Sequence, residues 1–236
     1  MPAKLMSENV LVFGAGGALG AAIASRLLGD GCTLFTAGTS RVPNAATHLP
    51  LAYEDPCDIS TFSSLPGLAA VVWAQGLNCS DTVESFEPTD LQRLLQGNVL
   101  FIASSLQALV MAGKLAPGSR LAVVSSIWQM ESRPGKLSYT ISKAALQGLV
   151  KSCALDLGPR GILINAVLPG VVDTPMTRTH LSTEQITKIT SQSALGRLPE
   201  PADIASAVAF LVSPANRAIT GQFLTVDGGF IGLKHA

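Results

Sequence analysis

The 236-residue chain is long enough for one large domain or two small ones, and no low-complexity linker divides it. Apolar residues make up 47% of the chain and charged residues only 14%, which excludes a disordered protein. The formal net charge is +0, so no overall field attracts nucleic acid or an anionic membrane, and we predict neither as a partner.

The four cysteines and three histidines are scattered, without a CxxC pair or the spacing of metal ligands. We therefore predict free thiols, no metal site and a cytoplasmic location, where thiols stay reduced. No run of about 18 uninterrupted apolar residues occurs, so no membrane-spanning segment is predicted.

Strand and helix signals alternate along the first half of the chain. Short apolar runs without strict alternation fit strands that are covered on both faces. We predict strands at residues 9–13, 33–37, 49–53 and 69–74, and a helix at 21–28 that glycines close. The segments 44–58 and 59–68 leave little room for full helices, so we expect shortened crossovers after the second and third strands.

The second half continues the alternation with longer helices. Apolar residues at helical spacing predict a helix at 90–112, and further helices follow at 139–157 and 201–212. Strands are predicted at 120–124, 162–168 and 222–226. The whole pattern predicts one α/β domain over residues 1–236, a doubly wound parallel sheet (a Rossmann fold) of about seven strands.

A glycine-rich turn, Gly14-Ala15-Gly16-Gly17-Ala18-Leu19-Gly20, links the first predicted strand to the first helix. Glycines let a backbone turn tightly and approach a pyrophosphate, which the free N–H groups of a helix N-terminus then bind. Such a motif by itself also serves plain strand–helix packing. Its position at the start of an α/β chain favours a dinucleotide site.

The end of the second predicted strand reads Ala37-Gly38-Thr39-Ser40-Arg41 and contains no carboxylate. A carboxylate there would bind the ribose 2′-hydroxyl of NAD and repel a 2′-phosphate. Two hydroxyls and a cation instead favour NADP(H), with Thr39, Ser40 and Arg41 as contacts, and leave NAD(H) open. The alternative for Arg41 is a solvated loop in which it touches nothing.

Tyr139 and Lys143 are four residues apart, which places both side chains on one face of a helix. A tyrosine hydroxyl titrates at about pH 10, and a nearby ammonium favours the phenolate and lowers that pKa. A YxxxK match alone often occurs by chance on a helix surface. Ser126, however, follows a predicted buried strand at the sheet edge where ligands bind, and its hydroxyl is suited to polarising a carbonyl.

The chain resembles short-form members of the short-chain dehydrogenase/reductase family along nearly its whole length. The matching features are, in order, the glycine turn, Asp58, Asn98, Ser126, Tyr139-xxx-Lys143, the segment 165–170, Thr174, Gly196-Arg197, the segment 201–205, Thr220-Gly221-Gln222 and Val226-Asp227-Gly228-Gly229. The end of the second strand and the tail are also similar to 3-oxoacyl-[acyl-carrier-protein] reductases.

The resemblance implies an oxidoreductase that interconverts a carbonyl and an alcohol with a nicotinamide cofactor. Tyr139 is then the general acid or base, Lys143 lowers its pKa and binds the nicotinamide ribose, and Ser126 holds the substrate oxygen. Asn98 positions a relay water or, alternatively, only satisfies backbone groups in a helix kink. Together with the residues argued above, the expected cofactor contacts are Gly14, Gly17, Leu19, Gly20, Thr39, Ser40, Arg41, Asp58, Ile59, Gly76, Tyr139, Lys143, Pro169, Gly170 and Thr174.

The chain departs from the family pattern in three features. Phe13 and Ala18 stand where Thr and Gly are usual, and the glycines follow the spacing Gly14-xx-Gly17-xx-Gly20, which is more typical of the family's extended members. Trp73-Ala74-Gln75-Gly76 replaces Asn-Asn-Ala-Gly. With Ala74 in place of the usual asparagine, hydrogen bonds of the sheet must be satisfied in another way. These departures bear on cofactor affinity and keep open a non-catalytic nucleotide-binding protein with a regulatory or assembly role.

The substrate is less well defined than the chemistry. Trp128, Gln129, Met130 and Arg133 are expected at the pocket entrance, with residues 171–193 as a mobile lid. Arg133 either meets an anionic group or is simply an exposed arginine. A 3-oxoacyl thioester is the leading substrate hypothesis, and other ketones, secondary alcohols or polyols are the alternatives.

The two longest predicted helices, 90–112 and 139–157, carry apolar residues beyond one face. Members of the family commonly pair these helices between subunits. We therefore predict a homotetramer or homodimer that acts on a small-molecule substrate.

Overall fold

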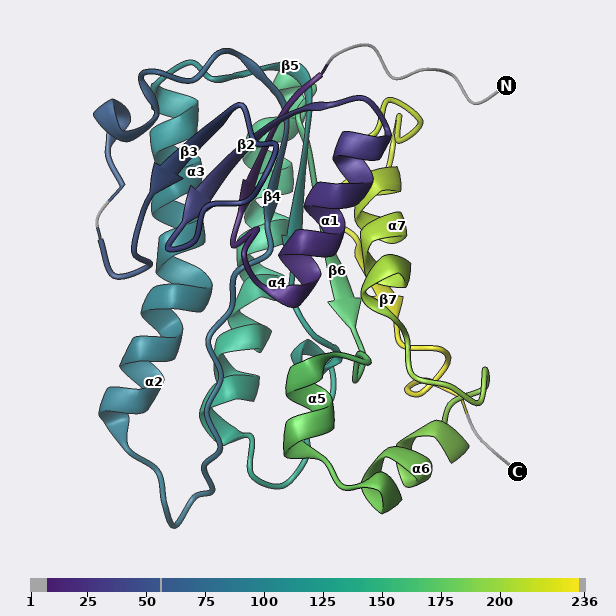
Figure 1. Ribbon diagram of the computed structural model, residues 1–236. Coiled ribbons are helices and arrows are strands. Elements are labelled where there is room, and N and C mark those ends of the chain that lie inside the picture. Colours follow the sequence, from purple (N-terminus) through teal and green to yellow (C-terminus); the bar gives the residue numbers. More distant parts are fainter. Residues whose placement is uncertain (1–7, 56, 234–236) are drawn as a thin grey trace.

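The computed structural model describes residues 8–55 and 57–233 and shows a seven-stranded parallel sheet with helices on both faces (Figure 1). The strands are β1 (Asn9–Phe13), β2 (Thr33–Gly38), β3 (Thr47–Pro50), β4 (Leu68–Trp73), β5 (Leu115–Val124), β6 (Leu163–Pro169) and β7 (Phe223–Val226). Their order across the sheet is β3-β2-β1-β4-β5-β6-β7. This is the order of a doubly wound fold, so the predicted fold class is confirmed.

Two layers of helices cover the sheet. α1 (Ala18–Gly29) and α7 (Pro201–Val212) pack together on one face, and α2 (Pro88–Leu95), α3 (Phe101–Met111) and α4 (Leu137–Leu157) cover the other (Figure 1). Successive side chains of a strand point to opposite faces, so Val12 belongs to the first core and Phe13 to the second. Burial on both faces explains why the central strands read as unbroken apolar runs.

The crossovers after β2 and β3 are short, as the sequence predicts. In the described residues between β3 and β4, the only helical segment is a 3-10 turn at Ile59–Phe62. β3 lies at Thr47–Pro50 instead of 49–53, because Thr47 pairs with Phe35 and sets the register. Tyr53 lies outside the sheet, and its ring packs 5.2 Å from that of Phe101 between centroids.

The predicted helix at 90–112 is interrupted at its centre. A π-helical turn, Gln96–Leu100, joins α2 to α3 and contains Asn98. By length and composition, Pro88–Met111 is apolar enough to cross a membrane, but 50% of its apolar window is buried within the protein. Its buried residues, such as Phe101 and Leu109, belong to the core beneath the sheet.

Two short helices, α5 (Pro175–His180) and α6 (Thr183–Ser191), lie beyond the carboxyl ends of the strands (Figure 1). Thr174 caps α5 by accepting a hydrogen bond from the Thr177 N–H at 3.2 Å. Ser182 and Gln185 form a reciprocal capping box at the start of α6. The segment predicted as a lid therefore consists of two capped helices next to the carboxyl edge of the sheet.

Candidate active site

The carboxyl end of β5 and the first turns of α4 bring Ser126, Tyr139 and Lys143 into one cleft of about 380 Å³. The Ser126 hydroxyl lies near that of Tyr139 and favours the tyrosinate form. Because the Ser126 Oγ accepts from the Trp128 N–H at 3.3 Å, its own proton is free to be donated. The Lys143 Nζ lies 5.7 Å from the centroid of the Tyr139 ring. The three predicted catalytic side chains thus lie together.

Burial shifts the titration of both ionisable groups. It raises the pKa of the Tyr139 hydroxyl above its ordinary value, and the nearby Ser126 hydroxyl opposes part of that rise. Burial also lowers the pKa of Lys143 to about 8. The predicted lowering of the Tyr139 pKa is not found in this geometry, because desolvation of the phenolate outweighs the opposing effects. Tyr139 therefore keeps its proton at neutral pH.

Asn98 is buried and does not line the cleft. Its Oδ1 accepts from the Leu77 N–H at 2.7 Å, and its Nδ2 donates to the Leu77 carbonyl and the Ser142 hydroxyl, both at 3.0 Å. Both amide hydrogens are therefore used within the protein. This is the backbone-satisfying role that the sequence left as an alternative, and it ties the π-helical turn to the residue before Lys143.

A smaller hollow of about 200 Å³ lies over the glycine turn and is lined by Gly14–Gly17 together with Gly38, Thr39, Ser40 and Tyr53. Gly17 also lines the catalytic cleft, so the two hollows adjoin. Three glycines of the turn cannot be replaced without a clash. A Cβ at Gly14 would lie 2.6 Å from the Gln75 backbone nitrogen, one at Gly16 would lie 2.7 Å from the Ser40 Cβ, and one at Gly20 would lie 2.1 Å from the Gly14 carbonyl.

The residues of this cradle fit a dinucleotide. The backbone at the start of α1 is open, since Gly16 and Gly17 are exposed and Gly17 has no side chain to block an approaching phosphate. In the adjoining cleft, the buried Gln75 amide has no hydrogen-bond partner at Nε2 or Oε1 among the described residues. An unpaired buried amide is costly, and this one lies where the cofactor is expected.

Most of the expected cofactor contacts line one of the two hollows. They are Gly14, Gly17, Leu19, Thr39, Ser40, Gly76, Tyr139, Lys143, Pro169, Gly170 and Thr174. Gly20 instead packs against the Gly14 carbonyl inside the turn. Asp58 and Ile59 are not among the lining residues, because the Asp58 carboxylate caps its own 3-10 turn by accepting from Thr61. Arg41 follows the lining Ser40 and is exposed.

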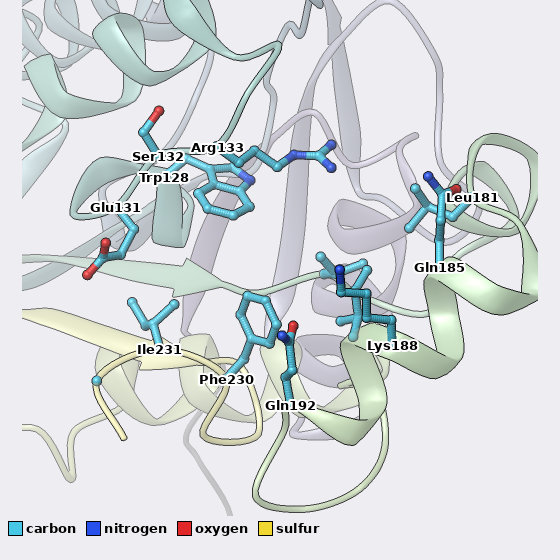
Figure 2. Close-up of a pocket in the computed structure, with 13 residues that line it drawn as sticks. Trp128, Glu131, Ser132, Arg133, Leu181, Gln185, Lys188, Gln192, Phe230 and Ile231 are labelled. Carbon is cyan, nitrogen blue, oxygen red and sulfur yellow. The ribbon is translucent and has the colours of Figure 1, made fainter. Parts of the chain in front are cut away.

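A larger pocket of about 640 Å³ adjoins the catalytic cleft, with which it shares Trp128, Arg133 and Val171. Its walls come from the segments after β5, β6 and β7 and from helix α6 with its flanking residues, and Figure 2 shows the labelled side chains of the β5, α6 and β7 parts. Trp128 and Arg133 lie where the sequence places them. Gln129 is buried and accepts from the Ser125 hydroxyl, while Met130 is exposed and lines neither pocket.

Comparison with known families decides the classification. A protein-family model described as "Enoyl-(Acyl carrier protein) reductase" matches residues 14–231, which is most of the chain. The chain is a short-chain dehydrogenase/reductase. Enzymes of this family that are named dehydrogenases use NAD(P)(H).

Individual members of the short-chain dehydrogenase/reductase family are similar to this chain over nearly its full length. A 3-alpha-(or 20-beta)-hydroxysteroid dehydrogenase of Mycobacterium bovis is 29% identical, covering 100% of this chain and 94% of that protein. A human (3R)-3-hydroxyacyl-CoA dehydrogenase is 32% identical, covering 96% of each chain. The solved structure of a short-chain dehydrogenase/reductase from Serratia marcescens is 28% identical, with a TM-score of 0.84 over 96% of this chain and 99% of that chain.

Two charged residues near the site of this short-chain dehydrogenase/reductase, Lys136 and Asp81, were not predicted from the sequence. Lys136 lines the cleft, and its Nζ donates to the Asn78 side chain, the Cys79 carbonyl and the Ser80 hydroxyl. The buried Asp81 accepts from the N–H and hydroxyl of Ser138, beside Tyr139. Both contacts join residues more than fifty positions apart in the chain, so no local motif signals them.

The two departures at Phe13 and Trp73 form one feature in this family member. The two residues are register partners on β1 and β4, and their rings stack with centroids 5.6 Å apart. Trp73 donates its indole N–H to the Ser105 hydroxyl at 2.9 Å. A stacked aromatic pair thus occupies two positions where the family usually has Thr and Asn, and the single polar atom it buries is satisfied.

Proposed function

We propose that this short-chain dehydrogenase/reductase interconverts a ketone and a secondary alcohol, with Tyr139 as general acid and base and NADP(H) as the preferred cofactor. The observation that carries the proposal is the placement of Ser126, Tyr139 and Lys143 in one cleft, with the Lys143 ammonium beside the Tyr139 ring. The glycine cradle adjoins this cleft and supplies a place for the dinucleotide.

Held by the glycine cradle and the adjoining cleft, a reduced nicotinamide would supply hydride to the carbonyl carbon. The Ser126 hydroxyl donates a hydrogen bond to the carbonyl oxygen, and Tyr139 transfers its Oη proton to that oxygen as the alcohol forms. The raised pKa of Tyr139, caused by burial, keeps this proton in place at neutral pH. Lys143 places its ammonium near the tyrosinate that is left behind. The reverse reaction uses the same groups with Tyr139 as base.

We propose a 3-oxoacyl thioester as the substrate. The human relative that is named (3R)-3-hydroxyacyl-CoA dehydrogenase supports this class, and the pocket of about 640 Å³ beside the cleft offers room for an acyl chain. Other relatives are named hydroxysteroid and cyclopentanol dehydrogenases, which keeps cyclic ketones as the second candidate. The four free cysteines remain the basis for placing the enzyme in the cytoplasm.

Substitution of Tyr139 by Phe tests the chemistry. With acetoacetyl-coenzyme A and NADPH as probes, we expect Tyr139→Phe to lower kcat by about 10²–10⁴-fold, the usual contribution of a general acid. Titration calorimetry should show NADPH binding unchanged within about twofold, because the variant loses only one hydroxyl. Equal inertness of wild type and variant towards a panel of ketones, with cofactor binding retained, would instead favour the non-catalytic nucleotide-binding protein.

Parallel titrations with NADPH and NADH test the cofactor preference. The absence of a carboxylate at Ala37–Arg41 and the hydroxyls of Thr39 and Ser40 in the cradle predict tighter binding of NADPH. Arg41→Ala should weaken NADPH binding about tenfold and leave NADH unchanged, since only NADPH carries a 2′-phosphate. Tighter binding of NADH to the wild type contradicts the preference.

A further inference from the structure

The pocket beside the catalytic cleft has mainly apolar walls. Its apolar lining consists of Trp128, Val171, Leu181, Ile189, Phe230 and Ile231. Helix α6 contributes Gln185, Lys188 and Ile189, whose spacing places them on one helix face, and Leu181 before the helix and Gln192 after it also line the pocket. This side of the pocket therefore presents two aliphatic side chains, two amides and one ammonium.

Two cations in this pocket have no ion-pair partner among the described residues. Arg133 and Lys188 are exposed, and the ion pairs between described residues all involve other side chains. The Arg133 guanidinium lies 5.8 Å from the centroid of the Trp128 ring, which holds it at the junction of pocket and cleft. Figure 2 shows the Arg133 and Lys188 side chains converging on the same part of the pocket.

Carboxylates do not offset these charges. Glu131 is the one acidic residue among the described residues that line the pocket, and its carboxylate points away from both cations (Figure 2). The adjoining cleft adds Lys136 and Lys143, and no described Asp or Glu lines it. The positive charge of Arg133 also contributes, after burial, to the lowered pKa of Lys136. The space between pocket and cleft is therefore positively charged.

We propose that the substrate carries an anionic group in addition to its carbonyl, and that Arg133 and Lys188 bind this anion while the apolar walls cover the carbon chain. The proposal rests on the function proposed above and narrows its substrate class to anionic carbonyl compounds. A carboxylate on the chain and a phosphate on a thioester carrier share this chemistry. Both offer oxygen acceptors of the kind that arginine binds with two parallel hydrogen bonds.

The first test measures binding without turnover. Isothermal titration of the full chain with saturating NADP⁺ compares octanoate with 1-octanol, two probes of equal chain length that differ in charge. We expect octanoate to bind about tenfold or more tightly than octanol, as a hydrogen-bonded charge would give. Arg133→Gln and Lys188→Gln should each weaken octanoate about tenfold and leave octanol unchanged. Arg217→Gln, which removes an equally exposed cation elsewhere, should change neither.

The second test uses turnover and distinguishes the two anions. The kcat/KM for 7-oxooctanoate is compared with that for its methyl ester, and acetoacetyl-coenzyme A supplies the phosphate-bearing carrier. Preference for the free acid indicates a carboxylate on the chain, whereas a loss confined to acetoacetyl-coenzyme A in Arg133→Gln and Lys188→Gln indicates the carrier phosphate. In either case, added salt should raise the KM of the anionic compound alone.

Equal binding of octanoate and octanol, with octanoate unaffected by both pocket variants, overturns the anion site. That outcome leaves the proposed reaction intact if Tyr139→Phe still abolishes reduction of the methyl ester. Conversely, selective octanoate binding without reduction of any ketone supports the anion site and contradicts the proposed reaction. The two proposals therefore fail separately.

Discussion

Among the residues of the site, Lys143 makes the clearest unfavourable contribution to the stability of the folded protein. Its ammonium is buried, and its hydrogen bond to the Val124 carbonyl is long, at 3.5 Å. Few favourable contacts therefore offset the loss of water, and burial lowers its pKa to about 8. The enzyme keeps a charge that folding alone would disfavour, as functional sites often do.

This cost predicts a pH dependence of stability. The lysine pKa falls from 10.5 to about 8 on folding, so between these pH values the unfolded chain binds a proton that the folded protein does not. The free energy of unfolding therefore rises with pH in that window, by about 3 kcal/mol in total. Relative to Lys143→Met, the wild type should be less stable at pH 7 and should regain most of the difference by pH 10.

Urea denaturation of both proteins across pH 7–10 checks this prediction. The exposed Lys151 provides a control, because Lys151→Met should follow the wild type at every pH. A constant difference between wild type and Lys143→Met across the range would show that burial of the ammonium carries no such cost.

At this scale, the sequence predicts the residues with local signatures. Ser126, Tyr139 and Lys143 and most of the glycine cradle lie together as expected. The direction of the Tyr139 pKa was not predictable, because it depends on how deeply folding buries the hydroxyl. Lys136 was missed for a related reason: its acceptors lie on a loop far away in the sequence.

Among the elements, helix α4 has an N-terminus that is capped from a distance. Its N-cap residue Lys136 supplies no capping hydrogen bond, and the Asp81 carboxylate instead accepts from the Ser138 N–H at 3.1 Å. A carboxylate at this end also interacts favourably with the helix dipole. Since Tyr139 follows Ser138 directly, the same contact orients the first turn of α4 towards the cleft.

Removal of this cap should affect both stability and catalysis. We expect Asp81→Ala to lower the free energy of unfolding by about 1–2 kcal/mol, because a buried N–H loses its acceptor. It should also lower kcat by more than it raises the KM for the cofactor, since Tyr139 loses its support while the glycine cradle is untouched.

Chemical denaturation and steady-state kinetics measure the two effects of Asp81→Ala. Asp90→Ala is the matched control: Asp90 lies in the first turn of α2 and pairs with the exposed Arg93, so a change within about 0.5 kcal/mol is expected. Asp81→Asn retains an acceptor and should restore part of kcat. Loss of stability with kcat unchanged would limit Asp81 to a structural role.

The helices and strands themselves were largely predictable from the sequence. Parallel strands that are buried on both faces need apolar residues at every position, so they appear in the sequence as apolar runs. β1 and α7 have the predicted bounds. The exceptions depend on contacts outside the element. The edge strand β3 takes its register from β2, and β5 begins at Leu115 instead of 120 because Leu115 pairs with Leu68 across a register shift. The π-helical turn forms where Asn98 reaches Leu77 and Ser142. None of these partners is visible in the local pattern.

On the scale of the whole molecule, apolar side chains remain uncovered on the two long helices. Leu100 and Met111 are exposed on the helical segment Pro88–Met111, and Ile141 and Leu155 are exposed on α4. Association of subunits would cover such residues. This supports the homotetramer or homodimer that we propose.

Sedimentation velocity at micromolar concentration tests the assembly. We expect a mass of two or four times 24.4 kDa for the wild type. The double variant Leu100→Asp and Leu155→Asp should shift the distribution towards the monomer while circular dichroism stays unchanged, because both positions are exposed in a single chain. A wild type that sediments as a monomer contradicts the proposal.

The stacked pair of Phe13 and Trp73 has a consequence for how this lineage diverged. The rings are fully buried neighbours, so a change to Thr at Phe13 alone would leave a cavity, and a change to Asn at Trp73 alone would place an amide among aromatic rings. Each single substitution towards the common family residues therefore gives a protein that is less stable than this one. The two positions should therefore be inherited as a unit, so that descendants keep both aromatic residues or exchange both.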